Sequence, residues 1–337
     1  MTNRILPVGK FPSEFLARLL AKAPVTDPRV VVRPGIGMDC AVVEAGDELW
    51  VFKSDPITFA TDEIGWYLVQ VNANDIATTG ALPRWLLVTL LLPEGRTTAE
   101  SAEGIMDGIY SACREMGISV IGGHTEITFG LERPIAVGTL VGGVPRDKLV
   151  TPRGCSTGDR VLLTKGVPIE ATAILAREFP ARLESKLTGE EIERAKRFLH
   201  EPGISILRDA QIALRAGRVT AMHDPTEGGL ATALWELAEA SGRAILFDPA
   251  AVPIPALSAR VCAVFDLDPL AAIASGALLL TAPEGDAEAI RRELENQRIV
   301  CEVIGEVREG LVEVRVKESG ELLRRPERDE IARVFEG

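Results

Sequence analysis

The stretch GWYLVQVNANDIATTGALP, residues 65–83, decides how the first half of this chain folds. Its apolar residues recur at a loose helical period, which predicts a helix, and Asp75 is its only charged residue. Asn72, Asp75 and Thr79 fall three and four positions apart and so share one face of that helix. A buried carboxylate is costly unless it is hydrogen-bonded, paired or metal-bound, so the helix should hold Asp75 against a cation. The alternatives to a metal are a helix N-cap and a buried ion pair.

The composition is that of a globular protein long enough for two domains. The 337 residues are 46% hydrophobic and 26% charged, without a low-complexity tract or a heptad run. The segment PRDKLVTPRG, residues 145–154, is charged, contains two prolines and has no apolar period. Such a segment is typical of a domain boundary, so we expect domains at residues 1–148 and 155–337.

Charge, hydropathy and cysteine spacing exclude several classes of protein. The formal net charge of −12 opposes binding to nucleic acid, although an acidic protein can bind a nucleotide when magnesium bridges its carboxylates to the phosphates. The longest apolar run, residues 85–92, is too short to cross a bilayer, and the start of the chain lacks a signal-peptide pattern. Five cysteines without a CxxC pair predict reduced, buried thiols. We therefore expect a cytoplasmic protein that binds neither nucleic acid nor a membrane.

Strand and helix patterns are interleaved along the whole chain, which predicts an α/β (α+β) fold. In the first half we expect helices at 11–23, 65–83 and 98–116 and strands at 30–32, 49–53, 85–92, 118–121 and 135–144. In the second half we expect helices at 169–178, 189–200, 204–216, 231–241 and 287–297 and strands at 159–164, 219–222, 244–247, 277–281, 300–304 and 311–316.

Three further aspartates stand where a ligand could be held. Asp39 follows the glycines of PGIGMD, Asp55 follows the apolar strand LWVFK, and Asp224 stands with Thr226 before a predicted helix whose amides favour anions. Each has a structural alternative. Asp39 could belong to a turn before a strand, Asp55-Pro56 could form a turn, and Thr226 could begin a capping box.

Paired glycines mark one more candidate, in the segment Gly122-Gly123-His124-Thr125-Glu126. Glycines that follow a strand let backbone amides approach an anion, and the threonine and glutamate add a hydroxyl and a carboxylate. A plain hairpin is the alternative, because another strand follows at 135–144.

Five motifs together resemble a known superfamily. GMDCAVV, KSDP, VNANDIATTGALP, IGGHTE and HDPTEGGLATALWELAEAS occur in the order found in the aminoimidazole ribonucleotide synthetase (PurM-like) superfamily. That group includes selenophosphate synthetase, thiamine-monophosphate kinase and formylglycinamidine synthetase. The chain most resembles the hydrogenase maturation carbamoyl dehydratase (HypE-like) group, also in Gly9-Lys10-Phe11 and Asp268-Pro269-Leu270.

The resemblance implies a two-domain fold with ATP and Mg2+ as cofactors. The N-terminal domain would bind ATP and magnesium and form a shared sheet in a homodimer, and the C-terminal domain would be a second α/β domain. Carried over by motif, the metal ligands would be Asp39, Asp55, Asp75 and Asp224, and the nucleotide would contact Gly122, Gly123 and Thr125, with Lys53, Asn74 and Thr226 as further candidates. His124 stands where several members carry an acid. No catalytic residue follows from the motifs.

Two departures from the family pattern shape the functional expectation. The maturation carbamoyl dehydratase ends in a cysteine that carries the carbamoyl group, whereas no cysteine follows Cys301 here. Selenophosphate synthetase uses a reactive cysteine or selenocysteine and a lysine near its start, whereas the first cysteine here is Cys40, within the metal motif. We therefore expect an ATP- and magnesium-dependent phosphoryl-transfer enzyme that activates an amide-like or small polar acceptor. The alternatives are a non-catalytic ATP-binding partner in metalloenzyme (hydrogenase) maturation and a thiamine-monophosphate kinase-like enzyme.

Overall fold

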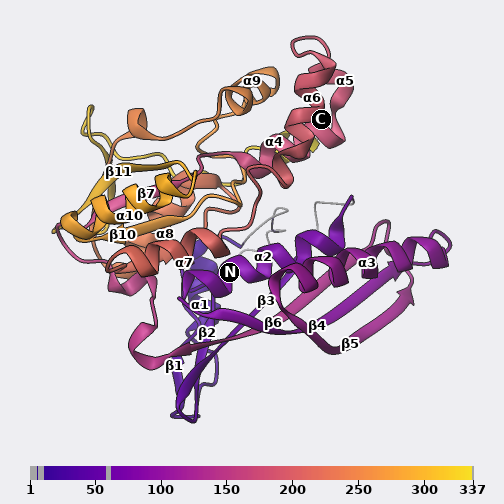
Figure 1. Cartoon of the computed structure of the whole chain (residues 1–337), viewed down its shortest axis with the longest axis horizontal. Helices are drawn as coiled ribbons and strands as arrows, with labels where there is room; N and C mark the ends of the chain where they lie inside the picture. Colours follow the sequence, from indigo (N-terminus) through magenta and orange to yellow (C-terminus); the bar gives the residue numbers. More distant parts are fainter. Residues whose placement is uncertain (1–5, 7–10, 58–61, 336–337) are drawn as a thin grey trace. The chain divides into compact units, whose positions relative to one another are not determined.

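The computed structural model describes residues 6, 11–57 and 62–335, so Gly9 and Lys10 lie outside the described residues. The chain divides into two compact units (Figure 1). The N-terminal unit comprises residues 26–33 and 39–150, and the C-terminal unit comprises 1–25, 34–38 and 151–337. Each unit contains one six-stranded sheet with helices packed on it, which confirms the predicted α/β class.

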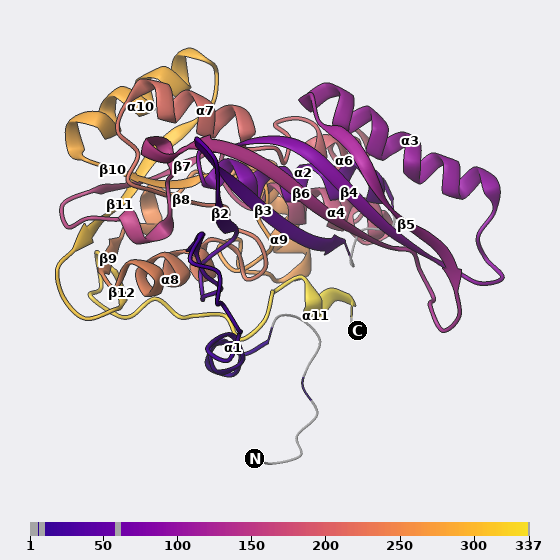
Figure 2. The same cartoon turned by 90° about the horizontal axis from the view of Figure 1, so that it is seen from below.

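The N-terminal unit is a sheet with two helices on one face. The strand order is β1-β2-β3-β6-β4-β5, and neighbours are antiparallel except for the parallel pair β4 and β5. The elements are β1 (Val30–Val32), β2 (Ala41–Ala45), β3 (Glu48–Ile57), α2 (Ile64–Thr78), β4 (Leu82–Pro93), α3 (Ala99–Met116), β5 (Ser119–Thr128), β6 (Ile135–Pro145) and η1 (Arg146–Lys148). Figure 2 shows the opposite face of this sheet, which no helix of the described part of this unit covers.

The helix α3 begins and ends where its capping residues predict, whereas α2 ends early. In α3, Thr98 accepts a hydrogen bond from the Ser101 backbone N–H in a capping box, and Gly117 ends the helix with φ 68°. The helix α2 ends at Thr78, earlier than the predicted 83, because Leu82 already begins β4. Almost every residue of α2 is buried, as its lack of charge indicates.

The predicted end of the strand at residue 121 is wrong, because β5 continues through the GGHTE segment to Thr128. The glycines serve the strand pairing: Gly123 has φ 148°, and a Cβ on it would lie 1.8 Å from the Val88 carbonyl oxygen of β4. The alternative hairpin is also wrong, because β4 lies between β5 and β6 in the sheet.

The C-terminal unit has the strand order β12-β9-β11-β7-β10-β8. Its helix α8 packs on one face of the sheet, where Leu163, Leu234 and Phe247 are almost fully buried, and α7 and α10 lie on the other face (Figure 2). The strands are β7 (Arg160–Thr164), β8 (Ala221–His223), β9 (Ala244–Phe247), β10 (Leu279–Ala282), β11 (Cys301–Arg308) and β12 (Val314–Val316). The helices are α1 (Ser13–Leu20), α4 (Ile169–Glu178), α5 (Pro180–Leu183), α6 (Gly189–Lys196), α7 (Leu207–Ala216), α8 (Gly229–Ser241), α9 (Ala256–Phe265), α10 (Glu284–Asn296) and α11 (Ala332–Phe335), with the 3-10 turns η2 (Pro152–Gly154), η3 (Arg197–Leu199) and η4 (Pro249–Ala251).

Most predicted elements of the second half are present, and α4 coincides with its predicted range. The helix α9 was missed, because its ten residues ALSARVCAVF are mostly apolar and give little amphipathic signal. The domains 1–148 and 155–337 stay a prediction. The compact units group residues 34–38 with the C-terminal unit, because Gly37 packs so closely on α8 that a Cβ would lie 2.8 Å from the Glu236 carbonyl oxygen.

Two further features concern the whole described chain. All five cysteines are buried, as predicted, and burial raises the pKa of Cys113 and Cys155 to about 11. Among the described residues, the helices are too short or too polar to reach across a lipid bilayer.

Candidate functional site

Three charged side chains of the N-terminal unit meet between β3 and α2. Lys53 and Asp55 are two residues apart on β3 and therefore share the face that α2 covers. The Lys53 Nζ lies 3.1 Å from Asp55 Oδ2 and 3.3 Å from Asp75 Oδ2 of α2. The side chain of Asp75 is only 5% exposed, that of Lys53 15% and that of Asp55 35%. The predicted helix thus does hold Asp75 against a cation, and in this structure that cation is an ammonium group.

Asp39 is the third carboxylate near this ammonium. It stands just before β2, whose first residue, Ala41, pairs with Phe52 of β3. Burial lowers the pKa of Lys53, but the attraction of Asp75, Asp55 and Asp39 outweighs burial and holds that pKa well above its usual value. Lys53 therefore stays charged beside these carboxylates.

Asn72 clamps α2 to β3 beside this group. Its Oδ1 accepts a hydrogen bond from the Asp55 backbone N–H at 3.1 Å, and its Nδ2 donates to the Asp55 carbonyl at 3.4 Å and to the Leu68 carbonyl at 2.9 Å. The sequence did place Asn72 on the same helix face as Asp75. Its role as a clamp was missed, because no motif shows which strand backbone the amide will meet.

The expectation that Asp55 ends a strand is wrong. The strand β3 continues through Pro56 to Ile57, paired with β6 on one side. On the other side of β3 the pairing with β2 ends at Phe52. Pro56 therefore interrupts no hydrogen bond between these strands, and the backbone N–H of Asp55 is available to donate to Asn72.

The predicted nucleotide contacts of β5 lie away from the carboxylates. Asp55 pairs with Gly138, which pairs with Val88, which pairs with Gly123, so Gly123 is three strands from Asp55, about 14 Å at the usual strand spacing. Asn72 of α2 packs over Gly138 between them. Gly122 and Thr125 lie beside Gly123 on this edge strand and are exposed. Within one N-terminal unit, these residues and the carboxylates are therefore not neighbours.

The remaining predicted residues differ in their surroundings. Asn74 is fully buried in α2. His124, on β5, is exposed and lies 3.0 Å from Glu126 through its Nε2. His124 thus contacts a residue of its own strand and pairs with Thr89 of β4.

Asp224 and Thr226 belong to the C-terminal unit, in the loop between β8 and α8. Asp224 is 1% exposed, and the preceding His223 is buried with its Nε2 2.9 Å from Glu236 Oε2 of α8. The alternative capping box at Thr226 is wrong, because the N-cap of α8 is Gly228, with φ 79°. The Gly228 N–H donates instead to Asp329 Oδ2 at 2.6 Å.

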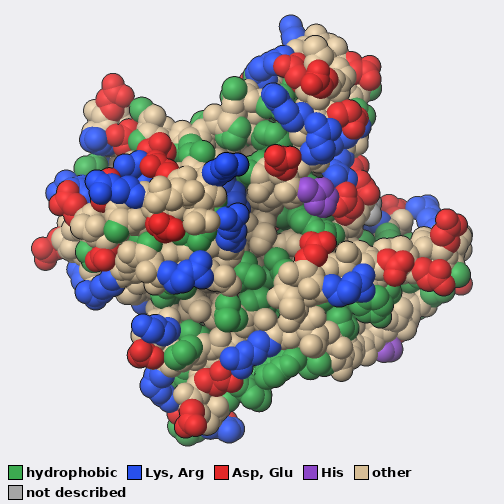
Figure 3. All heavy atoms as spheres, viewed as in Figure 1, with side chains coloured by type: hydrophobic (Ala, Val, Ile, Leu, Met, Phe, Trp, Pro, Cys, Tyr) green, Lys and Arg blue, Asp and Glu red, His purple; other side chains and the backbone are tan. Residues whose placement is uncertain are grey.

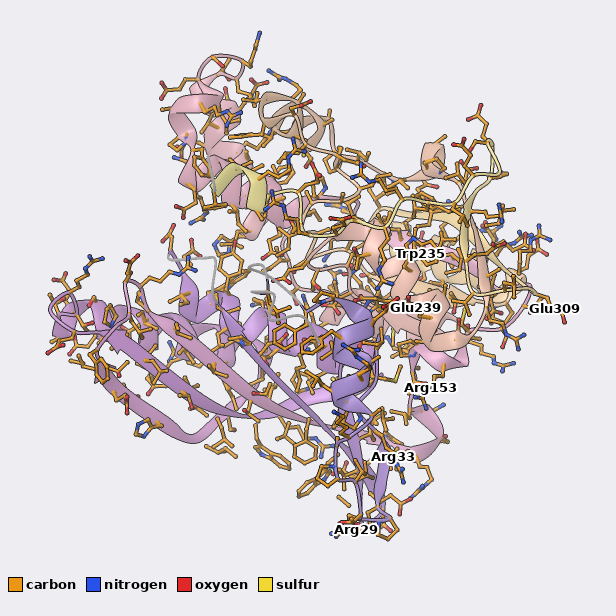
Figure 4. The ribbon with its side chains drawn as sticks, turned by 180° about the vertical axis from the view of Figure 1, so that it is seen from behind. Arg29, Arg33, Arg153, Trp235, Glu239 and Glu309 are labelled. Carbon is orange, nitrogen blue, oxygen red and sulfur yellow. The ribbon has the colours of Figure 1, made fainter. Side chains whose placement is uncertain are left out.

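The C-terminal segment that contains Leu323 and Arg325 also contacts side chains that project from α8. Trp235 and Glu239 project from α8 (Figure 4). The Trp235 Nε1 donates to the Leu323 carbonyl at 3.0 Å, and Glu239 pairs with Arg325. The segment from Leu323 to Asp329 therefore contacts both α8 and, through Asp329, the end of the loop that carries Asp224.

Two buried acids near that loop were missed by the sequence reasoning. Burial raises the pKa of Glu170, on α4, to about 7, although hydrogen bonds from Ser275 partly lower it. Burial likewise raises the pKa of Asp329 to about 6. Glu170 Oε2 accepts from the Ser275 backbone N–H at 3.2 Å. No pattern distinguished Glu170, because an acid in the first turn of a helix is ordinary.

The donor set around Lys53 fits a magnesium ion. Mg2+ prefers carboxylate and water oxygens, and the N-terminal unit brings the carboxylates of Asp55, on a strand, and Asp75, on a helix, to within 3.3 Å of one cationic position, while Asp39 attracts the ammonium from its loop. The ammonium at that position is a stand-in cation and shows that the surroundings stabilise positive charge.

Comparison with known proteins identifies the family. The sequence models of the AIR synthase related protein N-terminal and C-terminal domains match residues 37–144 and 156–317. The chain is 30% identical over 276 residues to the carbamoyl dehydratase HypE of Cupriavidus necator, covering 79% of this chain and 74% of that protein.

Two solved structures show the same fold. The hydrogenase maturation protein HypE in complex with ATP has a TM-score of 0.70 at 23% identity, covering 93% of this chain and 90% of that one. The protein AaThiL, complexed with AMPPCP and TMP, has a TM-score of 0.70 at 23% identity, covering 88% and 91%. The predicted PurM-like two-domain fold is confirmed, and the chain belongs to the AIR synthase related protein family.

Proposed function

We propose that this protein is an ATP- and magnesium-dependent enzyme that transfers a phosphoryl group to an amide-like or small polar acceptor. The observation that carries the proposal is the pair of Asp55 and Asp75 on either side of one mostly buried cationic position, with Asp39 adding its attraction from a nearby loop. Phosphoryl transfer depends mainly on positioning and charge neutralisation, which carboxylates and magnesium supply without a strong base. The related HypE solved with ATP and the related AaThiL solved with an ATP analogue support the choice of nucleotide.

In this proposal the carboxylates hold magnesium and the metal holds the phosphates. Asp75 and Asp55 are the main ligands, since α2 and the Asn72 clamp fix them, and Asp39 approaches from its loop. Asp224 is proposed as the fourth metal ligand. Gly122, Gly123, Thr125, Asn74 and Thr226 stay predictions for nucleotide contacts. When bound, magnesium would neutralise the phosphate charge.

We also propose a homodimer, because the uncovered face of the N-terminal sheet is apolar. Trp50, Phe52, Trp85 and Leu87 point to this face, and the Trp50 and Trp85 rings pack edge to face at 5.6 Å. Trp50 is 36% and Leu87 39% exposed. Figure 3 shows hydrophobic side chains along the lower border of this unit. Exposed apolar surface of this kind marks an association site, and we place a second copy on it.

A second candidate function is an ATP-binding partner in metalloenzyme maturation, which the likeness to a HypE maturation protein favours. A third is a thiamine-monophosphate kinase-like activity, which the likeness to AaThiL, solved with TMP, favours. The buried thiols fit a reducing compartment, so we propose the cytoplasm.

The proposal is tested by measuring nucleotide binding and turnover with magnesium and with a chelator. We expect binding of ATP that requires magnesium, and ADP release that increases with amide-like acceptors. Magnesium-dependent binding without turnover would favour the partner function, and turnover only with thiamine monophosphate would favour the kinase. Binding that is equal with and without a divalent cation would contradict the metal site and the proposed function.

A further inference from the structure

Lys53 takes part in this group of carboxylates in a way that the predicted metal site does not explain. Its ammonium lies within 3.3 Å of carboxylates from two elements, at the position that a bridging metal ion would need. A divalent cation and this ammonium would compete for the same oxygens, because both cannot lie among them without strong repulsion.

We infer that Lys53 is a built-in counter-ion: its ammonium occupies the metal position until a metal–nucleotide complex arrives, and then moves to the phosphate oxygens. This inference rests on the proposed function. Without a cation, Asp75 would be a buried negative charge beside a second carboxylate, that of Asp55, which is costly. Lys53 therefore stabilises the metal-free protein, while the attraction between its single charge and the two aspartates is weaker than that of a divalent cation at the same position.

The geometry allows the ammonium to move. Lysine carries a compact charge on a flexible four-carbon stem, so it can turn away without a change in the backbone of β3. Its side chain is 15% exposed, so a path to solvent or to a ligand exists on one side. A phosphate brought by the metal offers the new anionic partner that the ammonium needs after it leaves the aspartates.

This exchange predicts that metal and nucleotide bind cooperatively. A metal ion alone must displace the ammonium into water, whereas a metal bound with a nucleotide gives the ammonium a phosphate. By thermodynamic linkage, each ligand then raises the affinity for the other by the same factor. The metal bridge to the phosphates already couples the two ligands, and the exchange adds a part of the coupling that depends on the Lys53 charge; a purely structural ion pair at Lys53 would add no such part.

The test is a titration of the full-length protein with Mn2+, counting free Mn2+ by electron paramagnetic resonance, with and without a non-hydrolysable ATP analogue. In the wild type we expect weak Mn2+ binding alone and tight binding with the analogue. In Lys53→Met we expect Mn2+ alone to bind at least tenfold more tightly, and the coupling factor between metal and analogue to fall at least tenfold. Lys53→Arg, which keeps the charge, should retain weak binding of Mn2+ alone.

Controls separate this inference from the proposed function and from misfolding. Lys148→Met removes the same charge from an exposed side chain of the same unit and should leave both Mn2+ affinities unchanged. Lys53→Met should melt at a lower temperature than wild type in chelator and should gain more stability from Mn2+ than wild type does, which shows that it folds. Equal metal affinity and coupling in Lys53→Met and wild type would overturn the counter-ion inference alone. An absence of Mn2+ binding to wild type even with the analogue would overturn the proposed function too.

Discussion

Single residues decide the charge of the candidate site. Asp75 is buried in a helix with no other charge, and its Oδ2 lies 3.3 Å from the Lys53 ammonium of the neighbouring strand, to which the Asn72 clamp ties the helix. The nearby carboxylate of Asp55 adds to the negative potential. A site of this kind is stable only with a cation, whether that cation is an ammonium or a metal ion.

Asp75→Asn tests the metal ligand directly. Removing this carboxylate should weaken nucleotide binding in magnesium by at least roughly tenfold, an order of magnitude typical for the loss of one charged ligand group, with little change in chelator. Isothermal titration calorimetry measures both. Asp107→Asn, on the exposed face of α3, makes the same change away from the site and should bind like wild type. Equal affinity in Asp75→Asn and wild type would remove Asp75 from the metal site.

Glu170 predicts a dependence of stability on pH. Burial raises the pKa of Glu170 from 4.5 to about 7, so between these values the folded protein holds more protons than the unfolded chain. The contribution of Glu170 to the free energy of unfolding is therefore fully present below about pH 4.5. As the pH rises through 7, the free energy of unfolding falls by about 3 kcal/mol. Glu170→Gln should be more stable than wild type at pH 8, and this advantage should vanish at pH 4.5, as measured by urea unfolding.

The control for this titration lies on the same helix. Glu178, at the exposed end of α4, makes a matched variant, and Glu178→Gln should follow the wild-type pH profile. If Glu170→Gln and wild type differ by the same free energy at both pH values, the raised pKa of Glu170 is refuted.

At the scale of residues, the sequence marks the acids of the candidate site but does not show which side chains pair with them. Asp39, Asp55 and Asp75 could be selected because an isolated acid in apolar or glycine-rich surroundings is costly without a ligand. Lys53 was assigned to the nucleotide, whereas here it pairs with Asp55 and Asp75. Such pairings depend on how α2 lies on β3, which a residue pattern does not contain.

At the scale of elements, close packing of α2 on α3 positions Asp75. A Cβ on Gly65, in α2, would lie 2.2 Å from the Ile105 carbonyl oxygen of α3, so only glycine allows these helices to approach. In the same way, the close approach of β5 to β4 at Gly123 leaves no room for a Cβ. The alternation of elements was predictable from the sequence, but the continuation of β5 was not, because glycine pairs usually indicate a turn.

Gly65→Ala should therefore destabilise the protein. The added methyl must push α2 and α3 apart, and overpacking of this kind costs on the order of 2 kcal/mol. The matched control is Gly104→Ala, also helical, where nothing lies within 4 Å of the added Cβ, and it should be neutral or stabilising by up to about 1 kcal/mol. Chemical denaturation followed by circular dichroism measures both variants. A Gly65→Ala variant as stable as Gly104→Ala would show that α2 and α3 do not pack as described.

At the scale of the whole molecule, the uncovered sheet face predicts self-association. Leu87 and Tyr110 are both 39% exposed, but Leu87 lies on the apolar sheet face and Tyr110 on α3. Leu87→Glu should dissociate the dimer by placing a charge in the interface, and Tyr110→Glu should leave it intact. Light scattering at micromolar concentration distinguishes these states. A monomeric wild type would contradict the dimer proposal.

The position of the bound metal decides whether the two aspartates are its ligands. Anomalous X-ray diffraction from crystals of the wild-type protein grown with Mn2+ and a non-hydrolysable ATP analogue locates it. We expect an anomalous peak coordinated by Asp55 and Asp75, with the Lys53 ammonium turned toward the phosphates. A bound nucleotide without a peak there, and with Lys53 still between the two aspartates, would contradict this expectation.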